Sequence, residues 1–146
     1  MTNTFPRLKL RAASLEELVI ISSRLQDALV PLADMRFEAE AARFVAVVNR
    51  FHWEEEGADR RSLAGLRFDH VLRAQQRGLD SISHDRILDL LAITHDVPEP
   101  GKQGHVVLHF SGDAAIRLTV DKLACALEDL TEPWPTPWRP AHERQD

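Results

Sequence analysis

The clearest alternation of apolar and polar residues in the chain lies between Gly104 and Val120. Apolar side chains recur at every second position on both sides of Gly112-Asp113, which is typical of two strands that each bury one face. A three-residue loop, Gly112–Ala114, keeps both apolar sets on the same face, whereas a shift by one residue would separate them. The hairpin predicted on this basis pairs Phe110 with Ile116, Leu108 with Leu118, and Val106 with Val120.

After Asp121 the spacing of the apolar residues changes from that of a strand to that of a helix. The residues at this spacing are Leu123, Ala126, Leu127 and Leu130. Asp121 is a suitable N-cap, and Pro133 stops a helix. We therefore expect a second helix here, with the single cysteine, Cys125, as a small and partly buried residue between its apolar positions.

The first part of the chain predicts a short strand followed by a helix. Leu8 and Leu10 alternate with basic residues, which indicates a strand at the edge of a sheet. Ser14-Leu-Glu-Glu17 has the form of a capping box. The apolar residues behind it fit a helix from about Leu15 to Ala28 that ends before Pro31.

Four more stretches of the chain predict strands, and two of them are apolar on both faces, which places them in the middle of a sheet. The stretches are Ala33–Phe37, Phe44–Trp53, Leu66–Gln75 and Ile87–Val97. Pairing Phe37 with Phe44 makes the first two a consistent hairpin. The polar segment Glu54–Ser62 is predicted to be a loop.

These elements follow the order β-α-β-β-β-β-β-β-α, and short links between consecutive strands predict antiparallel pairing. We predict an α+β fold in which residues 1–132 form a single domain. Its bent, mostly antiparallel sheet has about seven strands, and two helices, one near the N-terminus and one after the last strand, pack on it. This is the element order of a pleckstrin-homology-like open barrel, except that such a barrel has no helix between its first two strands.

Length and charge narrow the class of protein. The 146 residues suit one domain that buries a core without a metal or a disulfide, and the single cysteine excludes an internal disulfide. The net charge of −5 and the absence of tyrosine argue against a dedicated nucleic-acid-binding surface. No apolar run is long enough to cross a membrane. We expect a cytoplasmic protein with neither a membrane nor a nucleic acid as its partner.

Several phrases of the sequence, taken together, carry a resemblance to a known family. They are VNRFHWE (Val48–Glu54), LRFDHVLRAQQRGLD (Leu66–Asp80), LDLLAITH (Leu88–His95), HFSGDAAIRLTVDKLACALEDL (His109–Leu130) and the closing PW…RPAHE. With these phrases the chain resembles a proteobacterial family of small uncharacterised proteins, a domain of unknown function. The hairpin turn of that family usually reads FAGG, where this chain has FSGD. The resemblance implies a single-domain bacterial cytoplasmic protein, and it brings no established activity and no catalytic residues.

The segment Asn49–Glu54 contains the sharpest cluster of candidate functional residues. Arg50, His52 and Glu54 stand at alternate positions and are predicted to project from one face at the end of a strand. Such a set can bind an anion or perform acid–base chemistry, with His52 as the group that titrates near neutral pH. Arg73 would add to an anion site if its strand lies alongside. The structural alternative is an Arg–Glu pair beside a partly buried histidine.

The sequence contains no recognisable motif for a metal, a nucleotide or a catalytic nucleophile. His95 would face His105 if the hairpin between them centres on Pro100, but no spacing supplies a third ligand. HExxH, GxSxG and GxxxxGK[ST] do not occur. We therefore predict no metal and no cofactor, and the sequence leaves open whether the protein is an enzyme.

Residues 133–146 form a C-terminal tail rich in proline and tryptophan. Its prolines forbid a helix and favour an extended course. Trp134, Trp138 and Arg139 are the residue types that anchor protein interfaces. The tail is predicted to pack on the domain or on a partner.

Our main functional hypothesis is a non-enzymatic protein-interaction or adaptor module, whose partner is an unknown protein or a second copy of this chain. It depends on the tail and on the absence of a catalytic motif. The alternative hypothesis is a small-molecule or anion-binding protein, or an enzyme, that uses Arg50, His52 and Glu54 at the end of their strand.

Overall fold

The computed structural model describes residues 7–80, 83–97 and 101–140, and these form eleven strands, one α-helix and three short 3-10 helices. The α-helix is α1 (Leu15–Arg24). The 3-10 helices are Leu32–Asp34, Ala39–Ala41 and Ser111–Asp113. The strands are β1 (Lys9–Ala12), β2 (Ala28–Pro31), β3 (Met35–Glu38), β4 (Arg43–Phe51), β5 (Arg60–Asp69), β6 (Val71–Arg77), β7 (Ile87–Asp96), β8 (Gly104–Phe110), β9 (Ala114–Val120), β10 (Cys125–Asp129) and β11 (Trp134–Pro135).

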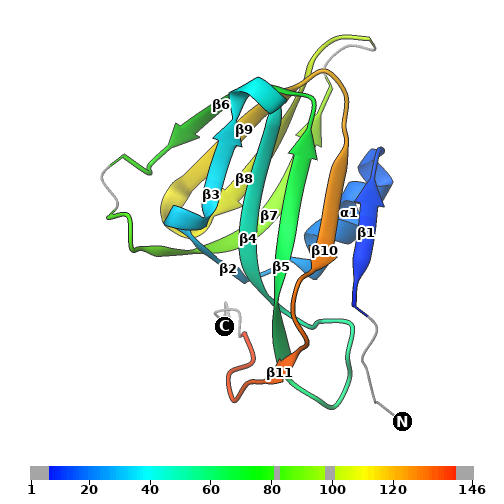
Figure 1. Cartoon of the computed structure of the whole chain (residues 1–146), viewed down its shortest axis with the longest axis vertical. Coiled ribbons are helices and arrows are strands. Elements are labelled where there is room, and N and C mark those ends of the chain that lie inside the picture. The colour runs from blue at the N-terminus through cyan, green and yellow to red at the C-terminus, as the bar shows by residue number, and fades with distance from the viewer. Residues whose placement is uncertain (1–6, 81–82, 98–100, 141–146) are drawn as a thin grey trace, which may run out of the picture.

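The strands form one antiparallel sheet that folds over on itself. Its order is β1-β10-β5-β4-β2-β7-β8-β9-β6, while β3 pairs with β4 and β11 pairs with β5. In Figure 1, strands β3, β4, β5 and β10 form the front layer, and β7, β8 and β9 form the layer behind it. The buried apolar side chains of both layers meet in a single core.

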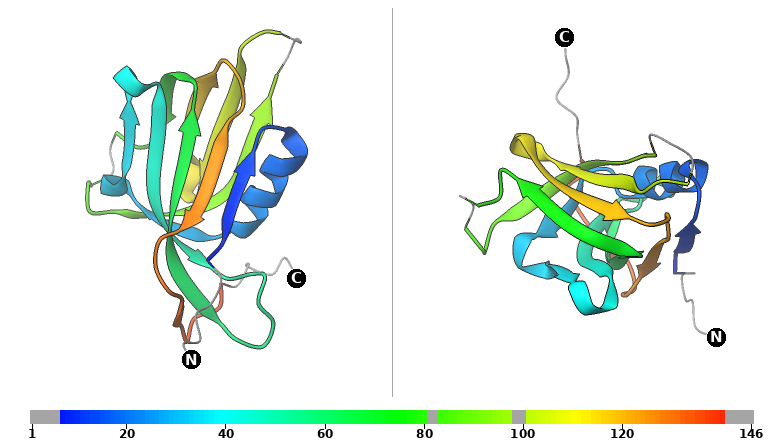
Figure 2. Two further views of the ribbon diagram at one scale, coloured as in Figure 1. Left: turned by 45° about the vertical axis from the view of Figure 1, so that its right-hand side comes forward. Right: turned by 90° about the horizontal axis from the view of Figure 1, so that it is seen from above.

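The helix α1 lies at the side of the folded sheet and packs against β1 and β7 (Figure 2). The Ser14 hydroxyl accepts a hydrogen bond from the Glu17 amide at 3.3 Å, and the Glu17 carboxylate accepts one from the Ala13 amide at 2.8 Å. Leu18 and Ile21 are buried. The local capping signal and the apolar stripe together explain why the helix begins where the sequence predicts.

The predicted fold class is wrong, because the structure has eleven strands and one helix instead of about seven strands and two helices. The segment expected to be the C-terminal helix is strand β10. Cys125 and Leu127 point into the core while Ala126 is half-buried and Glu128 is exposed. Pairing with β1 on one side and β5 on the other satisfies the backbone of β10. Tertiary pairing therefore overrides the helical spacing of this segment.

The first helix is also shorter than predicted. It ends at Arg24, and Ala28–Pro31 form strand β2 after a turn in which Asp27 has a positive φ of 61°. Leu29 of β2 pairs with Asn49 of β4 and with Asp89 of β7. Of the predicted helix, Leu25–Asp27 form this turn and only Ala28 belongs to β2, the strand that joins the two layers.

The hairpin of β8 and β9 exists, but its predicted register is wrong by two residues. Phe110 pairs with Ala114, Leu108 pairs with Ile116, and the loop is Ser111–Asp113. Gly112 and Asp113 have positive φ angles of 76° and 63°. Glycine and aspartate tolerate this conformation better than most residues, so the turn forms at these two positions. A shift by two residues leaves every side chain on its predicted face. The predicted pairing of Phe37 with Phe44 is confirmed.

The predicted long strand Leu66–Gln75 is two strands. β5 begins earlier, at Arg60, and ends before His70, whose φ of 59° turns the chain out of the front layer. β6 then joins the edge of the other layer beside β9. An irregularity between Val71 and Arg73 places Leu72 outside the pairing, so the alternation of buried and exposed positions changes phase there.

Candidate functional site

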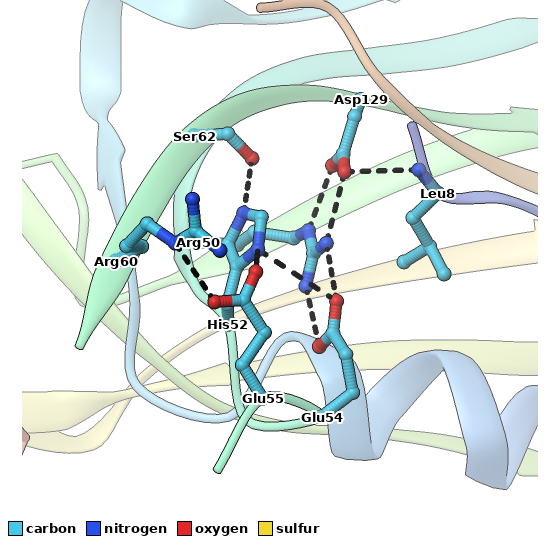
Figure 3. Close-up of polar contacts among 8 residues, drawn as sticks. All are labelled: Leu8, Arg50, His52, Glu54, Glu55, Arg60, Ser62 and Asp129. Carbon is cyan, nitrogen blue, oxygen red and sulfur yellow. Dashed lines mark hydrogen bonds and ion pairs between the residues drawn. The ribbon is translucent and has the colours of Figure 1, made fainter. Parts of the chain in front are cut away.

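Arg50 is at the centre of a buried polar cluster near the end of β4 (Figure 3). It is fully buried, on the same side of β4 as Val48. Its Nε and Nη2 atoms donate to the two carboxylate oxygens of Asp129 at 2.7 and 2.9 Å. Its Nη1 and Nη2 atoms donate to the two oxygens of Glu54 at 3.0 and 2.8 Å. Two carboxylates therefore occupy most of the N–H groups of this guanidinium.

The charges in this cluster stabilise one another. Burial by itself would lower the pKa of Arg50, but the hydrogen bonds and charges of Asp129 and Glu54 outweigh burial and raise it. Burial would raise the pKa of both carboxyl groups, yet Arg50 holds the pKa of each below its ordinary value. Both acids remain ionised at neutral pH and keep the guanidinium in place.

Asp129 also joins a third strand to the cluster. Its Oδ2 atom accepts from the Leu8 amide at 3.1 Å, and the Asp129 amide donates to the Leu8 carbonyl at 2.9 Å. Leu8 immediately precedes β1. The carboxylate thus connects β10 with β4 and with the start of β1, which indicates a structural role.

His52 forms a second set of contacts beside the first one. Its Nε2 atom lies 2.8 Å from the Ser62 hydroxyl, and its Nδ1 atom lies 3.2 Å from Oε1 of Glu55. Arg60 donates to the other Glu55 oxygen at 2.9 Å. A hydroxyl, an imidazole and a carboxylate in this order resemble the arrangement that activates a serine nucleophile.

The burial of Ser62 argues against such a nucleophile. Ser62 is fully buried and His52 is 5% exposed. A substrate therefore has no route to the hydroxyl in this conformation, and the contacts join β4 to β5. Sequence reasoning missed Ser62 because the strand register alone brings it to His52.

The structure brings three of the four predicted ligand-binding residues together. Arg50, His52 and Glu54 lie in one cluster, with the Arg–Glu pair that the structural alternative describes. Arg73 lies in β6, beyond the opposite end of β5. Arg43 of β4 pairs with Asp69 at this end of β5. Seven residues at about 3.3 Å each separate Arg43 from Arg50, so the end of β5 nearest Arg73 is roughly 23 Å from Arg50. An anion that binds Arg50 would have to displace the carboxylate of Asp129 or Glu54. The ligand-binding role of Arg50, His52, Glu54 and Arg73 stays a prediction.

The predicted tail residues lie on the other side of β4 and β5. Arg139 forms an ion pair with Asp59 at 2.9 Å, and its guanidinium lies over the rings of Phe51 and Trp53, at 5.3 and 5.6 Å from their centres. These contacts join Arg139 to the end of β4 and to the loop that follows it.

The two tryptophans of the tail differ in exposure. Trp134 lies in β11, where it pairs with Arg61 of β5, and it is 37% exposed. Trp138 is 77% exposed. The interface role of Trp134, Trp138 and Arg139 stays a prediction, while residues 141–146 lie outside the described part of the chain.

The outer side of the front layer carries a row of apolar residues that leads to this tail. We call the row Val45, Val47, Leu63, Gly65, Leu130 and Trp134 the apolar strip. A groove of about 350 Å³ includes four of these residues, and Arg36, Arg67, Asp34 and Glu128 also line it. Leu130 covers Gly65: a Cβ atom at this glycine would lie 3.7 Å from the Leu130 side chain.

His95 and His105, the two histidines considered as metal ligands, are not paired with each other. His95 pairs with Val106 and not with His105, which pairs with Asp96. Burial lowers the pKa of His95, and the nearby Asp96 charge opposes that shift. Among the residues that the structure describes, no group of three or more His, Cys, Asp or Glu side chains could hold a metal ion.

Comparison with known proteins gives one match. The model of a family described as a protein of unknown function, DUF2948, matches residues 8–142, which includes nearly all of the described chain. No curated protein and no solved structure matches the chain. In the described residues, no helix has the length and hydropathy needed to cross a membrane.

Proposed function

The chain belongs to the DUF2948 family of proteins of unknown function, and we propose that it is a non-enzymatic protein-interaction module of the bacterial cytoplasm. Its contact surface is the apolar strip together with Trp138 and Arg139 of the tail. The partner is a protein that places an apolar side chain in the groove lined by Val45, Val47 and Leu130.

The exposure of the apolar strip carries this proposal. Leu63, Leu130 and Trp134 are 36%, 47% and 37% exposed. The Leu130 amide donates to the Leu63 carbonyl, and Trp134 pairs with Arg61, two residues before Leu63 in β5. A contiguous row of apolar side chains open to water is typical of a protein-binding surface. Large aromatic side chains such as Trp138 supply the anchors of such surfaces.

The charges around the groove indicate the character of the partner. Arg36 and Arg67 lie on its rim together with Asp34 and Glu128. A rim with both signs of charge orients a partner without requiring a strongly charged one. This pattern favours a folded protein surface over a polyanion such as a nucleic acid.

The non-enzymatic part of the proposal is supported by the closed state of the polar clusters. The Arg50 guanidinium is held by two carboxylates, and Ser62 is fully buried. A catalytic group has to reach its substrate, which neither of these can do in this conformation.

The test is capture of a partner by the immobilised full chain, followed by titration of the purified partner in a calorimeter. We expect a stoichiometric complex. The variant Leu63→Lys/Leu130→Lys places two charges in the apolar strip and should weaken binding at least about tenfold. Trp134→Ala/Trp138→Ala should weaken it as well.

The matched control is Leu15→Lys/Val19→Lys, which makes the same chemical change at two exposed apolar positions of α1. It should bind the partner with unchanged affinity. Light scattering on the unmodified chain measures whether the partner is a second copy. The proposal fails if the strip, tail and control variants bind equally, or if the chain is monomeric and captures no stoichiometric partner.

A further inference from the structure

A regular array of polar side chains covers the outer side of β6, β9 and β8. Directly paired residues of neighbouring strands point to the same side of a sheet. The pairing places three rows on this side: Arg73, Thr119 and His105; Gln75, Arg117 and Val107; and Arg77, Ala115 and His109. We call these nine residues the basic face.

The irregularity at Leu72 is responsible for the arginines of β6 on this face. Without it, Arg73 would pair with Leu118, whose side chain is in the core. Because Leu72 is left out of the pairing, Arg73 pairs with Thr119, and Gln75 and Arg77 follow on the outer side. A strand that would otherwise bury its arginines therefore presents them to solvent.

A groove of about 470 Å³ lies on the basic face. Ala115 forms its floor, because the pairing places this small residue directly between Arg77 and His109. Each neighbour is one strand spacing away, about 4.8 Å. Arg117 lies two residues further along β9, and Val107 adds an apolar wall. Three basic side chains from three strands therefore surround one small residue.

These basic side chains retain hydrogen-bond donors for a ligand. Arg117 donates from Nε and Nη2 to Gln75 at 3.2 and 2.8 Å, which leaves its Nη1 group without a partner in the described chain. Arg77 contacts Asp113 at 3.4 Å, and its side chain is 67% exposed. His109 contacts the Thr94 hydroxyl through Nε2 at 2.9 Å. None of the residues lining the groove is acidic.

Thr119 lies on the same face but is not among the residues that line the groove. It is 4% exposed, and its Oγ1 atom has no hydrogen-bond partner among the described residues. Buried hydroxyl groups in folded proteins are normally satisfied. Thr119 lies two residues after Arg117 in β9, between Arg73 of β6 and His105 of β8. Three acidic groups of the described chain lie near this face: Asp96 pairs with His105, Asp113 contacts Arg77, and Asp80 accepts from Gln76 at the edge of the groove.

We propose that the basic face binds a small molecule through its phosphate group, with the phosphate above Ala115. Arginine forks match the oxygens of phosphate groups, and Arg77, Arg117 and His109 approach from three sides. A phosphomonoester has three terminal oxygens to meet them, whereas a carboxylate has two oxygens that one arginine can satisfy. The groove is larger than a phosphate, so the body of the ligand lies over Val107 and Gln75.

The test is a titration of the ¹⁵N-labelled full chain, at constant ionic strength, with phenyl phosphate and with benzoate, which has the same ring but a carboxylate. We expect the phosphate to shift the amide signals of Gln75, Arg77, His109 and Arg117 and to bind more tightly than benzoate. Arg117→Gln should weaken phenyl phosphate at least about tenfold. Arg11→Gln, with the same charge change on β1, should leave the affinity unchanged.

Three results would overturn the proposal. The first is equal binding of phenyl phosphate and benzoate, and the second is equal loss in Arg117→Gln and Arg11→Gln, since either would show general attraction of anions. The third is tighter binding of a single-stranded oligonucleotide that depends on Arg117, which would assign the face to a nucleic acid. Arg117 is exposed, so the variant should fold, and a thermal melt of each variant verifies this.

Discussion

Arg50 and Arg117 both lie on paired strands of the same sheet, but they face opposite sides of it. Arg50 is fully buried and holds two carboxylates, one of them 79 residues away in the sequence. Arg117 is exposed and contacts only the neutral amide of Gln75 among the described residues. The difference shows that the side of the sheet decides whether an arginine joins strands or remains available to a ligand. Each of the following predictions tests this difference.

The largest effect is expected from Arg50→Met. This substitution leaves the Asp129 carboxylate in a buried site without its cation, and removing one partner of a buried ion pair costs about 3–5 kcal/mol. Urea denaturation measures the free energy of unfolding. A loss below about 1 kcal/mol would mean that the cluster contributes little and that Arg50 is replaceable.

The second prediction concerns pH. Arg50 holds the pKa values of Asp129 and Glu54 below their ordinary range in the folded state. Their contribution to stability is therefore present above the pKa values of the unfolded chain, about 4, and is lost as the pH falls through the folded values.

The measurement is the urea midpoint of unfolding between pH 7 and pH 3. We expect the midpoint to fall less steeply with pH in the Asp129→Asn/Glu54→Gln variant than in the unmodified chain, because these two groups no longer titrate. Parallel curves would contradict the assignment of lowered pKa values to this pair.

A smaller loss of stability is expected when His52 loses its hydrogen-bond partner Ser62. Ser62→Ala removes the partner of His52 Nε2 in a buried site, which costs about 1–3 kcal/mol. The same variant tests the chemistry. Hydrolysis of p-nitrophenyl acetate should be equal in the unmodified and Ser62→Ala chains, and a rate that falls in the variant would identify Ser62 as a nucleophile.

The smallest effect is expected at Arg117. Arg117→Gln removes an exposed side chain that has no acidic partner in the described chain, so the free energy of unfolding should change by less than about 0.5 kcal/mol. Urea denaturation of Arg117→Gln and Arg50→Met under the same conditions compares their free energies of unfolding directly. A cost comparable to that of Arg50→Met would show that Arg117 has a structural role and would contradict the difference between the two arginines.

The two arginines also differ in what the sequence revealed about them. Arg50, His52 and Glu54 stand out as a cluster because they alternate along one strand, and the structure places them together. Asp129 was not recognised as their partner, since its segment was predicted to be a helix. The basic face was not predicted as a site at all, because the phase of β6 depends on the irregularity at Leu72.

The sequence by itself determined the features that depend on neighbouring residues. These are the start of α1 at the Ser14 capping box, the hairpin of β8 and β9, the pairing of Phe37 with Phe44, and membership of a family of unknown function. Each follows from the period of the side chains or from a signal within a few residues.

Only the tertiary structure decided the identity of β10, the contact of Ser62 with His52, and the array around Ala115. Each of these depends on which strands become neighbours and in what register. A segment such as Cys125–Asp129 fits either a helix or a strand by its own spacing. Pairing with β1 and β5 and burial of Leu127 select the strand, because the core and the backbone hydrogen bonds come from residues far away in the sequence.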